Sequence, residues 1–189
     1  MVVQKPTVRN MTIAALLTAL TILIPIMFSP IRIPVGLTFT ATLTVHAPIL
    51  IAMFISPMAA AFVAIGSAIG FFFSAPTVVF VRAATHVVFA VAGAYMIRKM
   101  SANVTFKLIL VWLVTMLLHA SFEAAAAGLM VYLAFEYPLY IAYAEAATTG
   151  VGTLIHHSID YAIMLVVLVA LSKARLIDFK FDSKKKAAL

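Results

Sequence analysis

The sequence contains no cysteine and little charge of either sign. Among its 189 residues, charged side chains make up 10%, and six residues are acidic. The absence of cysteine excludes disulfides, thiolate metal sites and cysteine nucleophiles. So little charge cannot cover the surface of a water-soluble domain of this size, which indicates that lipid surrounds much of the chain.

Apolar residues dominate what is present, at 65% of the chain, and the mean hydropathy is +1.16. A spanning helix needs roughly 20 mostly apolar residues, so the stretch from Met11 to Arg175 has room for about five to seven spans and for no soluble domain. The first apolar run follows Lys5 and Arg9, as in a signal peptide, but it lacks a small-residue cleavage site. We therefore interpret this run as a retained first helix.

Eleven of the thirteen basic residues gather in three clusters, which the positive-inside rule assigns to the cytoplasm. If all three clusters lie inside, an even number of spans separates each from the next, which favours six spans with cytoplasmic N and C termini. The last cluster predicts a basic cytoplasmic tail over residues 175–189, placed beside anionic lipid rather than nucleic acid. The clusters are Lys5 and Arg9; Arg98, Lys99 and Lys107; and Lys173, Arg175, Lys180, Lys184, Lys185 and Lys186.

These features predict an all-α membrane protein, built as a single transmembrane domain over residues 1–189. The helices are delimited by turn signals such as Pro25, Pro57 and Pro76. They are expected at about 11–27, 46–55, 58–73, 76–100, 106–135 and 145–172. The second and third are short, so they must tilt or thin the bilayer. Residues 136–144 are expected as an outer loop with interfacial tyrosines.

A strand-like segment follows the first helix. From Leu37 to Thr44, apolar residues alternate with threonine, which is the two-residue period of a strand. An open strand edge is not tolerated in lipid. We expect a short hairpin or lid at the outer interface or over a cavity, and an irregular start to the second helix is the alternative.

Three expected helices each carry two polar side chains at i, i+4 spacing, which places each pair on one helix face. An ionisable group in the bilayer core costs about 2.5–3.5 kcal/mol even on gentle insertion scales, so such groups need a reason. The helical rise puts all three pairs at a similar depth, from the midplane outward. The pairs are Arg82 and His86, His119 and Glu123, and His156 and Asp160, with His157 beside the last.

Together these pairs predict a pocket for a small polar molecule with a flat ring. His46, at the start of the second helix, is either an interfacial histidine or a further site residue. A purely structural role is the alternative, in which Arg82 pairs with Glu123 or Asp160 and ties the helices together. The candidate aromatic residues for the ring face are Phe39, Phe71, Phe72, Phe73 and Tyr161.

The sequence offers no motif for catalysis or for a cofactor. Phosphate-cradling loops and nucleophile elbows are absent, and no HExxH spacing supports a zinc site from His86, His119 and His156. We therefore expect neither a resident metal nor a cofactor. Gly66 and Gly70 lie four residues apart in an apolar helix, which indicates close helix packing.

The first helix carries Ala15 and Ala19, a small-xxx-small face that another helix can approach. With this motif, the proline-rich loop after it and the stretches HAPILIAMFISPMAAAFVAIGSAIGFFF and VRAATHVVFAVAGAY, the whole chain resembles the S components of energy-coupling factor vitamin transporters. The similarity points to the branch assigned to pyridoxine, hydroxymethylpyrimidine or niacin.

This resemblance implies a multi-pass protein of the bacterial cell membrane that binds a vitamin near the outer face. The pocket would be lined by helices four to six and capped by loops at about 29–43, 74–76 and 136–144. Ala15 and Ala19 would dock on a transmembrane coupling subunit, and two ATPase subunits would complete the transporter, so the chain itself is not expected to be an enzyme. The expected substrate-binding residues are Arg82, His86, His119, Glu123, His156, Asp160, His46 and Phe39.

The substrate is judged from charge. Arg82 could bind the carboxylate of nicotinate, but two acids, Glu123 and Asp160, face one arginine, which favours a neutral or weakly basic ring. We therefore expect pyridoxine or hydroxymethylpyrimidine, with niacin as the alternative. A membrane enzyme or a proton-coupled carrier that uses the histidine and acid pairs is the alternative outside this family.

Overall fold

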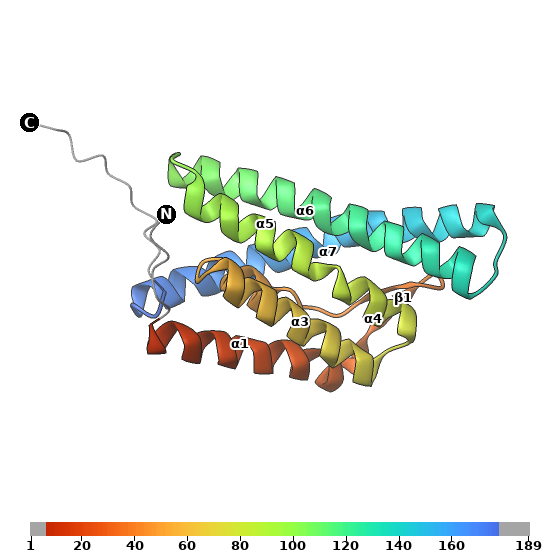
Figure 1. Cartoon of the computed structure of the whole chain (residues 1–189), viewed down its shortest axis with the longest axis horizontal. Coiled ribbons are helices and arrows are strands. Elements are labelled where there is room, and N and C mark those ends of the chain that lie inside the picture. The colour runs from red at the N-terminus through yellow and green to blue at the C-terminus, as the bar shows by residue number, and fades with distance from the viewer. Residues whose placement is uncertain (1–6, 178–189) are drawn as a thin grey trace, which may run out of the picture.

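The computed structural model describes residues 7–177, which form a bundle of helices that run side by side (Figure 1). An N-cap side chain starts three of the helices, from Thr7, Ser56 and Asn103. The helices are α1 (Val8–Met27), α2 (Ala47–Ala52), α3 (Pro57–Ser74), α4 (Thr77–Ala84), α5 (His86–Lys99), α6 (Val104–Leu129) and α7 (Leu139–Lys173). A 3-10 turn (Ser29–Ile31), two short strands, β1 (Ile33–Val35) and β2 (Phe39–Ala41), and a π-helical turn (Met130–Ala134) complete the chain.

Five helical stretches within residues 7–177 are long and apolar enough to cross a membrane. They are Val8–Met27, Pro57–Ser74, Thr77–Lys99, Val104–Ala134 and Leu139–Lys173. The helix expected at 46–55 is the exception, because α2 has only six residues and cannot span a bilayer alone. In Figure 1 the chain between α1 and α2, together with α2 itself, runs back along the bundle in the place of the expected second helix.

Two further helix expectations were wrong in their boundaries. The helix expected at 76–100 is divided at Thr85 into α4 and α5, where the Thr85 hydroxyl donates to the Arg82 carbonyl oxygen over 2.7 Å. The helix expected at 145–172 begins earlier, at Leu139 after Pro138, so much of the expected loop at 136–144 is helical. Pro138 favours a helix start at the residue after it. From the sequence alone, the tyrosine-rich composition of this segment indicates an interfacial loop instead.

The predicted hairpin is confirmed, although its first strand lies in residues expected to be irregular. β1 and β2 pair antiparallel, with Val35 opposite Phe39 and Ile33 opposite Ala41. Gly36 makes the turn at φ +67°, a left-handed conformation that glycine adopts without strain. The hairpin lies beside α7.

Close packing of α1 on α3 depends on the two glycines identified in the sequence. A Cβ atom at Gly66 would lie 2.8 Å from Thr21 Oγ1, and one at Gly70 would lie 2.6 Å from the Ile22 carbonyl oxygen. The Thr21 hydroxyl also lies 3.0 Å from the carbonyl oxygen of Val63 on α3. The backbones therefore meet directly, as the spacing of the glycines predicts.

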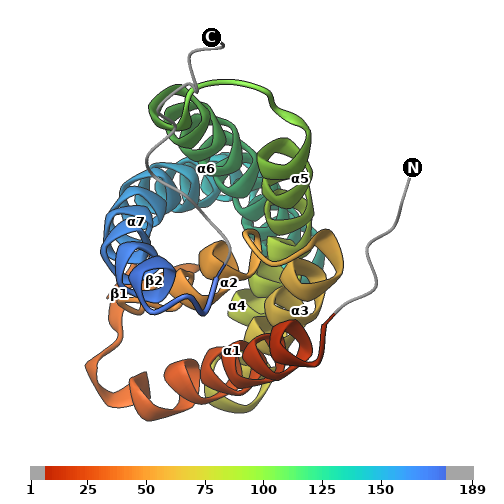
Figure 2. The same ribbon diagram turned by 90° about the vertical axis from the view of Figure 1, so that its left-hand side faces the viewer.

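The two ends of the described chain lie at the same end of the bundle. A guanidinium nitrogen of Arg9, near the start of α1, donates to the carbonyl oxygen of Arg175 after α7 over 3.1 Å. Figure 2 looks from this end and shows α2, whose six residues are all buried, inside the ring of long helices. The described basic residues of all three clusters lie near this end, on α1, α5, α6 and α7; Lys5, Lys180 and Lys184–Lys186 lie outside the described residues.

Candidate functional site

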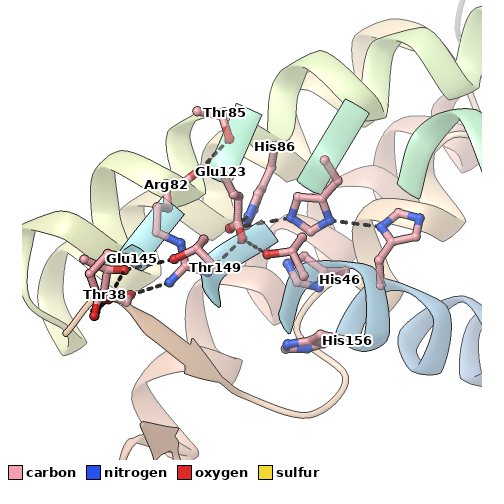
Figure 3. Close-up of polar contacts among 12 residues, drawn as sticks. Thr38, His46, Arg82, Thr85, His86, Glu123, Glu145, Thr149 and His156 are labelled. Atoms are coloured by element: carbon pink, nitrogen blue, oxygen red, sulfur yellow. Dashed lines mark hydrogen bonds and ion pairs between the residues drawn. The ribbon is translucent and has the colours of Figure 1, made fainter. Parts of the chain in front are cut away.

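A cluster of buried ionisable side chains occupies the interior of the bundle (Figure 3). It joins α2, α4, α5, α6 and α7, so the polar pairs of the three expected helices do meet at one depth. Each of these side chains is buried, and most are less than 6% exposed. The members are His46, Arg82, His86, His119, Glu123, His156, His157 and Asp160.

Arg82 and Glu123 form the central ion pair. Arg82 Nη2 donates to Glu123 Oε2 over 2.7 Å, and the His86 ring nitrogen Nε2 lies 3.1 Å from Glu123 Oε1. The Thr153 hydroxyl of α7 donates to the same carboxylate. Of the two pairings open to Arg82 in the sequence, the structure has the one with Glu123.

Asp160 has a different set of partners, centred on the start of α2. Its carboxylate accepts the backbone N–H groups of Thr44 and His46, over 2.9 and 3.0 Å, and lies 2.9 Å from His46 Nδ1. His156 Nε2 is 3.1 Å from the same carboxylate, without hydrogen-bond alignment. His46 therefore belongs to the buried cluster and not to the membrane interface.

A third chain of contacts leads deeper between α6 and α7. His119 Nδ1 lies 3.0 Å from His157 Nδ1, and His157 Nε2 lies 3.1 Å from the Thr115 hydroxyl. His157 is completely buried and contacts Thr115 and His119, whereas His156 lies beside Asp160. The two rings are neighbours in the sequence but have different partners. His157 therefore contacts His119 through the Nδ1 atom of each ring.

Glu145 holds the hairpin down and was missed by the sequence reasoning. Its carboxylate accepts the backbone N–H groups of Leu37 and Thr38 over 2.9 and 3.1 Å, and the Thr38 hydroxyl over 3.0 Å. Arg82 Nη1 donates to the Thr38 carbonyl oxygen over 2.6 Å. The turn of the hairpin is therefore bonded to α7 and to α4. The only available signal was an acid in a segment otherwise free of charge.

The expected aromatic residues divide into two groups. Phe39 is buried against Gly152 and beneath the Arg82 guanidinium, 5.1 Å from the ring centroid, in cation–π geometry. Phe71 is also buried and lines the cavity described next. Tyr161 is buried and donates to the Leu108 carbonyl oxygen, whereas Phe72 and Phe73 are 60% and 70% exposed on the lipid side.

A small cavity of about 10 Å³ lies between the hairpin, Phe71 and the ion pair, room for a single water. Four of its lining side chains carry a buried polar atom that has no hydrogen-bond partner within the described residues: Thr40 Oγ1, Thr42 Oγ1, Arg82 Nε and His156 Nε2. Buried polar groups are nearly always paired, so these atoms are candidates for contact with a polar ligand or a water.

A much larger apolar groove of about 920 Å³ runs between the hairpin and α7. It shares Thr42 and His156 with the small cavity, so the two spaces meet at those side chains. Its walls are apolar, from residues such as Phe28, Ile33 and Val151.

The chain is similar over almost its full length to a protein named niacin transporter NiaX, from Lactococcus lactis subsp. cremoris (strain MG1363). The two sequences are 38% identical over 192 residues, which cover 96% of this chain and 82% of the relative. No family model matches the chain, and no solved structure matches it.

The buried ion pair generates a prediction about stability. Replacing either partner alone, as in Arg82→Met or Glu123→Leu, leaves an unpaired buried charge and should cost about 3–5 kcal/mol. The double variant removes both charges and should recover most of that loss. A double-mutant cycle on unfolding free energy in detergent measures the coupling. Lys107→Met, at the bundle end, is the control and should change little; additive losses from the two single variants would contradict a coupled pair.

Proposed function

This chain belongs to the S components of energy-coupling factor transporters, and we propose that it is the subunit that binds niacin for uptake. S components are transport proteins and not enzymes. The chain has several helices that could span a membrane, and it is a multi-pass protein of the bacterial cell membrane with a role in vitamin transport. The similarity to a niacin transporter favours niacin over pyridoxine and hydroxymethylpyrimidine, which the charge count in the sequence had put first.

The unpartnered polar atoms around the cavity are the observation that carries this proposal. Arg82 Nε is always a donor, and the hydroxyls of Thr40 and Thr42 can donate as well. Donors of this kind suit the carboxyl group of niacin, and the ring nitrogen of His156 suits its pyridine nitrogen. The face of Phe71 matches the flat ring.

The remaining buried side chains form the frame of the proposed binding site. Glu123 and Asp160 hold Arg82, His46 and His156 in place through the contacts described above. Phe39 supports the Arg82 guanidinium from the other side. The proposed substrate-binding set is thus Arg82, His86, His119, Glu123, His156, Asp160, His46 and Phe39, to which the cavity adds Thr40 and Thr42.

Binding requires the hairpin to move. Pockets for small molecules measure roughly 300–1,000 Å³, whereas the cavity measures about 10 Å³. The hairpin is held at its turn by Glu145 and Arg82, and the apolar groove beside it supplies room for displacement. We propose that residues 29–43 act as the lid, and that these bonds hold it in the closed position, in which the cavity has room for a single water.

The proposed membrane orientation has both termini in the cytoplasm, with six passages in one transmembrane domain. The positive-inside rule supports it, because the described basic residues lie at the end of the bundle where α1 begins and α7 ends. The lid then faces outward. A transmembrane coupling subunit and two ATPase subunits are the proposed partners, and Ala15 and Ala19 are exposed on α1, available for docking.

The function is tested by ligand binding to the purified chain in detergent without ATP. We expect nicotinic acid to bind by calorimetry with one site per chain, more tightly than pyridoxine and hydroxymethylpyrimidine. The reason is that the cavity offers donors at Arg82 and the two threonines to a carboxylate, which the other two vitamins lack. Tighter binding of pyridoxine or hydroxymethylpyrimidine, or no binding of any of the three, would overturn the proposal.

The site itself is tested by Thr42→Val. The Thr42 hydroxyl has no partner within the described residues, so its removal should leave the melting temperature unchanged or higher. Niacin affinity should fall about 3- to 10-fold, the value of one hydrogen bond. Thr21→Val is the matched control, because this buried hydroxyl bonds Val63 outside the site: stability should fall and niacin affinity should stay. Unchanged niacin binding by Thr42→Val would remove Thr42 from the site.

Docking is tested by Ala15→Trp and Ala19→Trp. A large side chain on the small-residue face should keep the coupling subunit from approaching α1, so co-purification with the complete transporter should be lost while niacin binding remains. Leu20→Trp is the control, since Leu20 is 47% exposed on the same helix but points about 100° away from Ala19. Normal assembly of both alanine variants would exclude this face as the docking surface.

A further inference from the structure

Three imidazole rings and one carboxylate converge at the inner side of the cavity, on His46, His86, His119 and Glu123. The three histidines each offer a ring nitrogen within 4.8 Å of the others. Their ring centroids are 4.5–4.9 Å apart, with the planes nearly perpendicular. Imidazoles that pack only as apolar rings need no such convergence of nitrogens.

A second group holds each of the three rings through Nδ1. Asp160 lies 2.9 Å from His46 Nδ1, Ser67 lies 3.3 Å from His86 Nδ1, and His157 lies 3.0 Å from His119 Nδ1. A second group thus occupies Nδ1 of each ring, which leaves Nε2 as the nitrogen that could bind a metal ion; on His86 this nitrogen now bonds Glu123 Oε1. Histidines that bind metals characteristically have their other nitrogen held in this way, which fixes the tautomer and aims the ligand atom.

The contacts behind His119 fix its tautomer. The Thr115 hydroxyl donates its one proton to backbone carbonyl oxygens of α6, so it accepts from His157 Nε2–H. The neutral His157 ring then has a lone pair at Nδ1, which accepts from His119 Nδ1–H. His119 Nε2 then carries a lone pair, 3.5 Å from Glu123 Oε1 and without a hydrogen-bond partner among residues 7–177. A lone pair that faces a carboxylate is stabilised by a cation bound to both, which is a proton or a metal ion.

The net charge of the buried side chains also favours a bound cation. Among the described residues, three acids are buried, Glu123, Glu145 and Asp160, whereas Arg82 is the one buried arginine or lysine. With neutral histidines the buried formal charge is −2. Uncompensated charge in a low-dielectric interior is strongly unfavourable, and one divalent cation would neutralise it.

We propose that His46, His86 and His119, through Nε2, and the Glu123 carboxylate bind one divalent transition-metal ion of the zinc class. Imidazole and carboxylate ligands in a four-coordinate set suit Zn²⁺. Metal–ligand bonds of about 2.0–2.1 Å place tetrahedral ligand atoms about 3.3 Å apart. The distances from Glu123 Oε1 to His86 Nε2 and His119 Nε2 are 3.1 and 3.5 Å.

Metal binding requires two local changes. His86 changes tautomer: the Nε2 proton that now donates to Glu123 is lost and one proton is taken up at Nδ1, facing the Ser67 hydroxyl, so the ring stays neutral and Nε2 can bind the ion. The three histidine nitrogens also draw together from separations of up to 4.8 Å. Arg82 Nε, the two threonines and His156 stay free for the vitamin at the outer side of the same cavity. The proposed site differs from the triad of His86, His119 and His156 considered in the sequence, because His46 takes the place of His156 and Glu123 is added.

The test uses the full chain in detergent, purified without chelator and analysed for metal, then stripped and titrated with Zn²⁺ by calorimetry. We expect one ion per chain, and Co²⁺ should give the intense visible bands of four-coordinate cobalt. His119→Ala should weaken Zn²⁺ binding by more than about 100-fold. His156→Ala is the matched control: the same substitution on a buried histidine of the same cavity should keep one Zn²⁺ per chain and weaken niacin binding.

The cobalt spectrum is measured on the unaltered chain, so the proposal remains testable if a variant fails to fold. Absence of stoichiometric Zn²⁺ binding, a six-coordinate cobalt spectrum, or full Zn²⁺ binding by His119→Ala would each overturn it. Loss of Zn²⁺ with His156→Ala but not with His119→Ala would assign the ion to the other candidate set of His46, His156 and Asp160 and would overturn this one. Niacin binding by the stripped chain is measured in parallel, so failure of the metal site is distinguished from failure of the proposed function.

Discussion

The Arg82 guanidinium connects the lid, the aromatic floor and the buried acids, and the rest of the site depends on it. One of its nitrogens bonds Glu123, another bonds the Thr38 carbonyl oxygen in the hairpin, and its face covers Phe39. The planar fork of arginine makes these contacts at once, which lysine could not. Since buried ion pairs are often no more stable than apolar replacements, its presence is better explained by recognition and lid closure than by stability.

Glu145 gives the lid its second point of attachment. Two backbone N–H groups and a hydroxyl at the hairpin turn converge on its carboxylate, and Gly36 leaves the space in which that carboxylate lies. The hairpin is thus closed by polar bonds at its tip, while its flank meets only an apolar groove.

The sequence predicted the parts of this molecule that follow from local periodicity. The i, i+4 pairs, the hairpin and the contact of Gly66 and Gly70 with another helix all depend on spacing along one element. What it missed depends on tertiary partners. The start of α2 at Ala47 follows backbone groups at Thr44 and His46 that are bound by Asp160, more than 100 residues away. Glu145 resembled a helix boundary because its partners are backbone groups, which leave no pattern in the side chains.

The charge count in the sequence favoured pyridoxine or hydroxymethylpyrimidine, whereas the relative found by comparison is a niacin transporter. The contacts of the charged side chains bear on this difference. Two acids against one arginine favoured a neutral ring, but a count cannot tell which charges are engaged. Glu123 and Asp160 are both occupied by donors from the protein, whereas Arg82 Nε and the hydroxyls of Thr40 and Thr42 have no partner among the described residues and belong to side chains that line the cavity. Hydrogen bonds satisfy those acids without cancelling their charge, so an anion such as nicotinate would still enter a negative interior. A divalent cation on His46, His86, His119 and Glu123 would remove that obstacle, because it neutralises the interior at the wall opposite the donors that a carboxylate needs.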